Sequence, residues 1–135
     1  MRLSPHFELI EFIQSPTGAR MRIDNTPAPL HIENLRKLSL TVLEPIRTKL
    51  GRPIIVTSGY RCPRLNAAVG GASSSAHLKG AAADIIVPGL SADQLFEQIR
   101  RLDLVVDQVI NEYHQWVHVG IATDRPPRRQ YFLIT

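Results

Sequence analysis

The spacing of apolar residues predicts that the first half of the chain is largely helical. From Ile32 to Leu50, apolar side chains recur at intervals of three and four residues, which corresponds to one face of an amphipathic helix. Pro45 lies inside this segment, where its missing N–H and its ring are expected to kink or break the helix.

Two shorter segments precede this helix. Ser4 followed by Pro5 is a favourable helix start, so the sequence predicts a short helix over residues 5–13. Residues 16–29 contain three prolines and one glycine and are expected to form a loop.

Short apolar and β-branched runs predict strands in the rest of the chain. These runs cover residues 53–58, 83–87, 105–111, 116–121 and 130–134. Ser91 and Gln94 form a capping box, which predicts a helix that ends near Leu102. Helices come first and strands follow, which favours an α+β fold with a small, mostly antiparallel sheet.

The composition predicts one globular domain over residues 1–135. The chain is 44% hydrophobic and carries a net charge of +4, which is compatible with nucleic acid or with an anionic polymer such as a bacterial wall. Its basic residues are scattered, except for Arg125, Arg128 and Arg129, so no nucleic-acid partner is expected. The apolar runs are too short to span a bilayer. Cys62 is the only cysteine, so any metal site must rest mainly on histidine and carboxylate.

Two polar residues stand in a segment of very small side chains. In SSAHLKGAAADI, residues 74–85, His77 and Asp84 are seven positions apart among alanines and one glycine, Gly80. Taken singly, His77 is explained as a surface loop residue and Asp84 as a polar start to a strand. Further along, strand alternation in WVHVG places Trp116 and His118 on one face.

A metal site would connect these residues. A histidine in a strand is commonly a core residue, but catalytic zinc sites take three protein ligands, often histidine and carboxylate, and keep one position for water. His77, Asp84 and His118 offer such a set. Glu112 is either a solvent-facing turn residue or the base that a hydrolytic site needs. Arg61 is either a surface charge or a fork for a substrate carboxylate.

Three motifs resemble a known family, the zinc D-Ala-D-Ala carboxypeptidases, whose fold is shared with the Hedgehog signalling domain. The motifs are SGYRCPRLN, the S-x-H-x-x-G-x-A-x-D pattern from Ser75 to Asp84, and the E-x-x-x-W-x-H pattern from Glu112 to His118. The resemblance extends over nearly the whole chain. It implies a Hedgehog/DD-peptidase-like fold with helices packed on one side of the sheet.

The resemblance also implies a role for each matching residue. His77, Asp84 and His118 would bind Zn²⁺, and Glu112 would be the general base. Arg61 would bind the terminal carboxylate of the substrate or polarise its carbonyl group. Ser75 would hydrogen-bond near the substrate, and Trp116 would shape the wall of the pocket.

The sequence departs from the pattern of some family members at two positions. Some members place the acidic residue three positions before the last histidine, where this chain has Gln115, and some carry a His-x-His motif, whose first position is Trp116 here. His114 lies on the His118 face only if the strand extends that far back. Cys62 beside Arg61 is expected to be a buried, inert thiol, because no partner orients it as a nucleophile.

The expected function is that of a zinc metallopeptidase acting on peptidoglycan stem peptides, as a D-Ala-D-Ala carboxypeptidase or an L-Ala-D-Glu endopeptidase. The alternative is a zinc-bearing binding or phage structural module without catalysis. A peptidoglycan peptide is the expected partner, with neither nucleic acid nor membrane, and the chain is expected to be a monomer. The N-terminus lacks an apolar signal segment. The family that the sequence resembles also includes phage endolysins. Together, these two points predict that the protein accumulates in the cytoplasm before its release to the wall.

Overall fold

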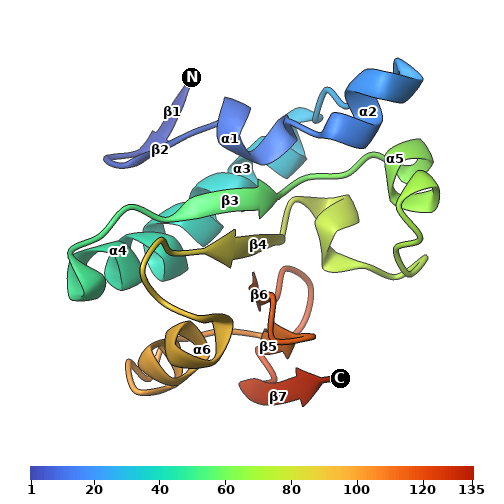
Figure 1. The fold of residues 1–135 in the computed structure, drawn as a ribbon. Coiled ribbons are helices and arrows are strands. Elements are labelled where there is room, and N and C mark those ends of the chain that lie inside the picture. The colour runs from blue at the N-terminus through green and yellow to red at the C-terminus, as the bar shows by residue number, and fades with distance from the viewer.

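A five-stranded mixed sheet organises the chain in the order β3–β4–β6–β5–β7 (Figure 1). A computed structural model describes all residues, 1–135. The strands are β3 (Ile55–Ser58), β4 (Ala82–Ile86), β5 (Gln108–Glu112), β6 (Trp116–Gly120) and β7 (Gln130–Ile134). Three pairings are antiparallel, and only β5 and β7 run parallel. The predicted α+β fold with a mostly antiparallel sheet is therefore confirmed.

Helices precede and interrupt the strands. The longer ones are α3 (Pro29–Leu38), α4 (Glu44–Leu50) and α6 (Ala92–Arg100), and the π-helical turn η1 (Ser39–Leu43) joins α3 to α4. The short ones are α1 (Ile10–Ile13), α2 (Pro16–Met21), α5 (Pro63–Ala68) and the 3₁₀ turn η2 (Ala76–Lys79). None of these helices combines the length and the apolar character that crossing a bilayer requires.

One face of the sheet and the longer helices share a single hydrophobic core. Ile85 of β4 and Val119 of β6 are fully buried there, together with Leu35, Ile46 and Ile99 from helices α3, α4 and α6. Because strand side chains alternate between faces, the neighbouring positions on β4 and β6 point to the opposite face. The residues that pack into the core therefore determine which residues of β4 and β6 lie on the opposite face of the sheet.

Pro45 does not break the predicted helix over residues 32–50. The segment stays helical from Pro29 to Leu50, and it widens into η1 just before the proline. The Glu44 N–H donates to the carbonyl oxygen of Ser39, five residues back. A wider turn accommodates a residue that lacks an N–H and carries a ring, so the apolar face continues through it.

The helix predicted over residues 5–13 is wrong for its first half. Residues 2–8 form an antiparallel hairpin of β1 (Arg2–Ser4) and β2 (Phe7–Glu8), and only α1 is helical. The Ser4 hydroxyl donates to Glu44 Oε2 at 2.6 Å instead of capping a helix, and the His6 N–H donates to the same oxygen at 2.8 Å. The distant Glu44 carboxylate therefore holds this segment as a turn.

Other boundaries differ by smaller amounts. The predicted loop over residues 16–29 contains α2, whose N-terminus is capped by Ser15 Oγ, and the predicted strand over 105–111 begins only at Gln108. The Ser91–Gln94 capping box is confirmed, with reciprocal bonds of 3.1 and 2.8 Å.

The N-terminal part packs on the end of β3 through a glycine. The Tyr60 N–H donates to the Phe12 carbonyl oxygen at 2.8 Å, and a Cβ at Gly59 would lie only 2.6 Å from that oxygen. Only a residue without a side chain allows this approach between backbones.

We therefore expect Gly59→Ala to lower the free energy of unfolding by about 1–3 kcal/mol, as overpacking against rigid backbone does. Urea denaturation followed by circular dichroism measures this change. Gly18→Ala is the matched control, because a Cβ there would meet Ser15 Cβ at an ordinary 3.4 Å. Equal stability of the two variants would contradict the expectation.

An ion-pair group ties the segment after β6 to the start of β5. The buried Asp107 carboxylate accepts hydrogen bonds from the guanidinium groups of Arg125 and Arg128. The Arg128 hydrogen bonds lower the pKa of Asp107 most, and those of Arg125 add to them, so that the pKa lies well below its ordinary value although burial opposes the shift.

The lowered pKa of Asp107 predicts how stability depends on pH. The carboxylate stabilises the fold above the pKa of an unfolded aspartate, about 4, and this contribution is lost as the pH falls toward the lower folded pKa. The difference in unfolding free energy between the wild type and Asp107→Asn should therefore be largest near neutral pH and shrink between about pH 4 and pH 2. Urea titrations across that range measure it, and a constant difference would exclude a charged Asp107 as the cause.

Candidate metal centre

Three polar side chains converge on the sheet face opposite the core. Asp84 of β4 lies directly opposite His118 of β6 in the antiparallel register, and His77 approaches from η2. Asp84 Oδ1 lies 3.2 Å from His77 Nε2 and 3.1 Å from His118 Nδ1. All three residues are buried, and their candidate ligand atoms lie within 4.8 Å of one another.

The backbone around η2 sets the orientation of His77. Ser75 Oγ accepts a hydrogen bond from the His77 N–H, and Gly80 ends the turn in a left-handed conformation with φ +69°. His77 Nδ1 lies 2.6 Å from the carbonyl oxygen of Gly59. Because a carbonyl can only accept, Nδ1 carries a proton, and Nε2 is the ring nitrogen that faces Asp84.

This arrangement fits a cation. One carboxylate oxygen of Asp84 lies within hydrogen-bonding distance of a ring nitrogen of each histidine, and all three side chains are buried. Burial raises the pKa of the Asp84 carboxyl group, but hydrogen bonds from His118 and His77 hold the pKa well below its ordinary value. A charged carboxylate between two imidazoles is a donor set that transition metals bind.

Glu112 lies beside this group at the end of β5. Its Oε1 is 3.6 Å from His118 Nδ1, and its side chain is about one-fifth exposed. Burial raises the pKa of Glu112, and the negative charge of Asp84 raises it further. The carboxyl group therefore holds a proton more readily than an exposed glutamate does, which suits proton transfer near neutral pH.

One donor next to these acids has no acceptor in the protein. Arg61 Nη2 donates weakly to Ser75 Oγ at 3.4 Å, while Arg61 Nε is buried without a partner. Trp116 Nε1 is buried beside Glu112, and a hydrogen bond from it opposes the rise in the pKa of Glu112. Burial lowers the pKa of Arg61, while the charges of Asp84 and Glu112 oppose this shift. A buried donor without an acceptor is costly in a free protein, so Arg61 Nε is placed to meet an acceptor on a ligand.

All seven site residues predicted from the sequence line one cleft of about 630 Å³. They are Arg61, Ser75, His77, Asp84, Glu112, Trp116 and His118. The structure thus brings together three segments that lie far apart in the sequence. The roles assigned to these residues remain predictions, because geometry alone does not test them.

Three neighbouring residues lie outside the cleft. His114 is at the surface, where its Nδ1 lies 2.7 Å from Asp93 Oδ1, and Gln115 is exposed in the turn between β5 and β6. Cys62 is half-buried, and its Sγ caps α5 by accepting from the Leu65 N–H. The thiol was expected to be fully buried, and its capping position at the start of α5 explains the partial exposure.

Sequence reasoning missed two features of the cleft. The carbonyl group of Gly59 orients His77, but a backbone acceptor has no sequence signature. Arg125 and Arg128 were noted only as a dense basic group, and no sequence pattern linked them to Asp107, which lines the same cleft.

Comparison with known proteins agrees with this geometry. A family model described as peptidase M15 matches residues 5–120, which include the whole His–Asp–His group and Glu112. No curated protein matches the chain. The match spans most of the sequence, so the chain belongs to the M15 peptidases, the metallopeptidase family of the zinc D-Ala-D-Ala carboxypeptidases.

Proposed function

We propose that the protein is a zinc-dependent peptidase that hydrolyses peptide bonds in peptidoglycan stem peptides, either as a D-Ala-D-Ala carboxypeptidase or as an L-Ala-D-Glu endopeptidase. The observation that supports this most directly is the buried His77–Asp84–His118 group with Glu112 3.6 Å from its last member, in one open cleft.

The donor set favours zinc. Two imidazoles and one carboxylate are ligands that catalytic zinc sites use, and His77 is already oriented through Gly59 in the manner of a metal ligand. Bound zinc polarises a carbonyl group and makes a water molecule more acidic. His77, Asp84 and His118 would hold the ion, and the cleft leaves one side of the group open to the substrate.

Glu112 is the residue that moves protons in this proposal. As a carboxylate it accepts a proton from the attacking water, and as a carboxylic acid it returns that proton to the departing amine. Its burial and the nearby Asp84 raise its pKa, so both protonation states are accessible during turnover.

Arg61, Ser75 and Trp116 bind the substrate in this proposal. The free Nε of Arg61 supplies a donor for a carboxylate or carbonyl oxygen of the peptide, and Trp116 forms part of the cleft wall. A non-catalytic zinc module would need the same three ligands, but it would have no use for a half-buried glutamate beside them. The position of Glu112 therefore favours hydrolysis.

Asp84→Asn tests the metal site. The amide is nearly isosteric but uncharged, so the affinity for Zn²⁺ should fall more than the roughly 10–100-fold that losing an outer-shell partner costs. Competition with a chromophoric chelator measures the dissociation constant. His114→Ala, outside the cleft, is the control and should bind zinc like the wild type; a zinc affinity unchanged in Asp84→Asn would refute the assignment of this ligand.

Glu112→Gln tests catalysis separately from metal binding. We expect the variant to retain zinc and to lose about 10²–10⁴-fold in turnover, because the amide cannot carry the proton. The measurement is mass spectrometry of purified peptidoglycan after digestion, with and without a chelator. The matched control is Glu97→Gln, the same change on the exposed face of α6, which should leave turnover unchanged.

Two outcomes would count against the proposed function. The absence of any zinc-dependent product from the wild type would exclude the peptidase. Full biological activity of Glu112→Gln would instead favour the non-catalytic zinc module.

A further inference from the structure

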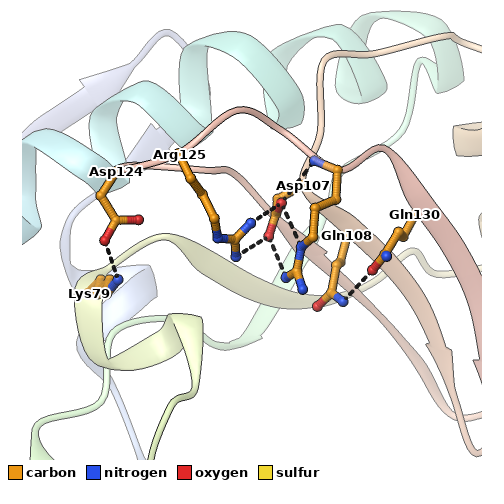
Figure 2. Close-up of polar contacts among 7 residues, drawn as sticks. Lys79, Asp107, Gln108, Asp124, Arg125 and Gln130 are labelled. Carbon is orange, nitrogen blue, oxygen red and sulfur yellow. Dashed lines mark hydrogen bonds and ion pairs between the residues drawn. The ribbon is translucent and has the colours of Figure 1, made fainter.

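Two arginines in the cleft share one buried carboxylate (Figure 2). Arg125 Nη1 and Nη2 lie 2.8 and 2.9 Å from the two oxygens of Asp107. Arg128 donates from Nε at 3.1 Å, from Nη2 at 2.7 Å and from its backbone N–H at 3.0 Å. These bonds saturate the acceptor capacity of Asp107 and fix both guanidinium groups in place.

The arginines keep most of their donors free. The side chain of Asp107 is 6% exposed, whereas those of Arg125 and Arg128 are 45% and 42% exposed. A guanidinium has five N–H donors, and each arginine uses only two of them on Asp107. The remaining donors have no acceptor in the protein, so the pair can accept a further anion without losing its anchor.

The sheet carries mostly small side chains between the metal centre and the arginines. Ala82, Gly120 and Gln108 form the next row of the sheet on the same face, two residues along the strands from Asp84 and His118. The first two have almost no side chain, and Gln108 is bonded to Gln130 of β7 at 2.9 Å (Figure 2). This row runs across the strands, so an extended peptide that follows the strands from the metal centre toward the arginines crosses it without meeting a bulky side chain there.

The distance suits a group a few residues from the scissile bond. Ile110 of β5 is the strand partner of His118, and Asp107 lies three residues before Ile110. Three residues of a strand correspond to about 10 Å. An extended peptide covers the same distance in about three residues.

The charge at this end of the cleft is positive. Lys79, paired with Asp124 at 3.2 Å across the cleft, lines it together with Arg125 and Arg128. Three cations face only two carboxylates here, so one positive charge is in excess. Both arginines lie beyond residue 120, where the match to the M15 family ends, so membership of the family does not account for them.

We propose that Arg125 and Arg128, held by Asp107, form a second carboxylate-binding subsite that recognises an acidic group of the peptide about three residues from the bond that is cut. This inference rests on the peptidase function proposed above. The subsite is distinct from Arg61, and it selects peptides that carry a free carboxylate over amidated ones.

The test is a binding measurement with two probe peptides. Both are stem pentapeptides that begin with L-Ala-D-Glu and end in D-Ala-D-Ala, so that D-Glu is the third residue before the D-Ala-D-Ala bond. One probe has the D-Glu carboxylate free, and the other has that carboxylate amidated. Calorimetric titration into zinc-loaded Glu112→Gln protein avoids cleavage during the measurement. We expect the acidic peptide to bind about tenfold more tightly, as charge-assisted hydrogen bonds at a partly exposed site permit.

Arginine variants in the same background locate the preference. Arg128→Ala should weaken binding of the acidic peptide until the two affinities are similar, and it should leave the affinity for the amidated peptide unchanged. Arg125 still pairs with Asp107 in this variant, so the buried carboxylate keeps a partner. Arg128→Lys, which keeps the charge but not the planar fork, should recover part of the preference. Arg129→Ala is the matched control: it removes the same charge one residue away, from a side chain that pairs with Asp103 and does not line the cleft.

The outcomes separate this inference from the proposed function. Equal binding of both peptides to protein with intact arginines would overturn the subsite, and so would an equal effect of Arg129→Ala, which would indicate charge alone. A preference that depends on Arg128, in a wild-type protein that cleaves neither peptide, would support the subsite and count against the peptidase. Failure of both peptides to bind would overturn the subsite and the peptide substrate together.

Discussion

The register between β4 and β6 is the constraint on which the rest of the structure depends. It sets Asp84 opposite His118 on one face, while Ala83 lies opposite Val119 and Ile85 opposite Val117 on the other. A slip of one residue would turn the polar pair into the core and the apolar pairs toward the cleft. The same pairing therefore stabilises the hydrophobic core and assembles two of the three candidate ligands, so the site gains its rigidity from the core.

The face opposite the core divides by charge. Acidic groups gather where β5 ends and β6 begins, and the arginines gather where β5 begins and β6 ends. Between them, Gly120 lines the cleft and adds no side chain to its floor. In the proposed peptidase, a cation near one end of the cleft and free donors at the other would fix both the position and the direction of a bound peptide.

Local patterns in the sequence predicted what local physics controls. Alternation in WVHVG and the capping box at Ser91 depend on neighbouring residues, and the structure has both as predicted. The turn at Ser4 was mispredicted because its partner, Glu44, lies forty residues away. The anchoring of Arg125 by Asp107 was likewise invisible, since the choice among several carboxylates depends on tertiary structure. Of the seven predicted site residues, residue chemistry raised the three candidate ligands, Glu112 and Arg61 as alternatives to ordinary structural roles. The resemblance between motifs then decided among these alternatives and added Ser75 and Trp116.

The close approach of Gly59 to Phe12 links two parts of the molecule that seem unrelated. The Gly59 carbonyl oxygen fixes the ring of His77, and the same residue holds the N-terminal segment through its missing side chain. Docking of the N-terminal segment and orientation of His77 are therefore thermodynamically coupled. If docking of the segment strengthens ion binding by a given free energy, ion binding must stabilise the docked segment by the same free energy.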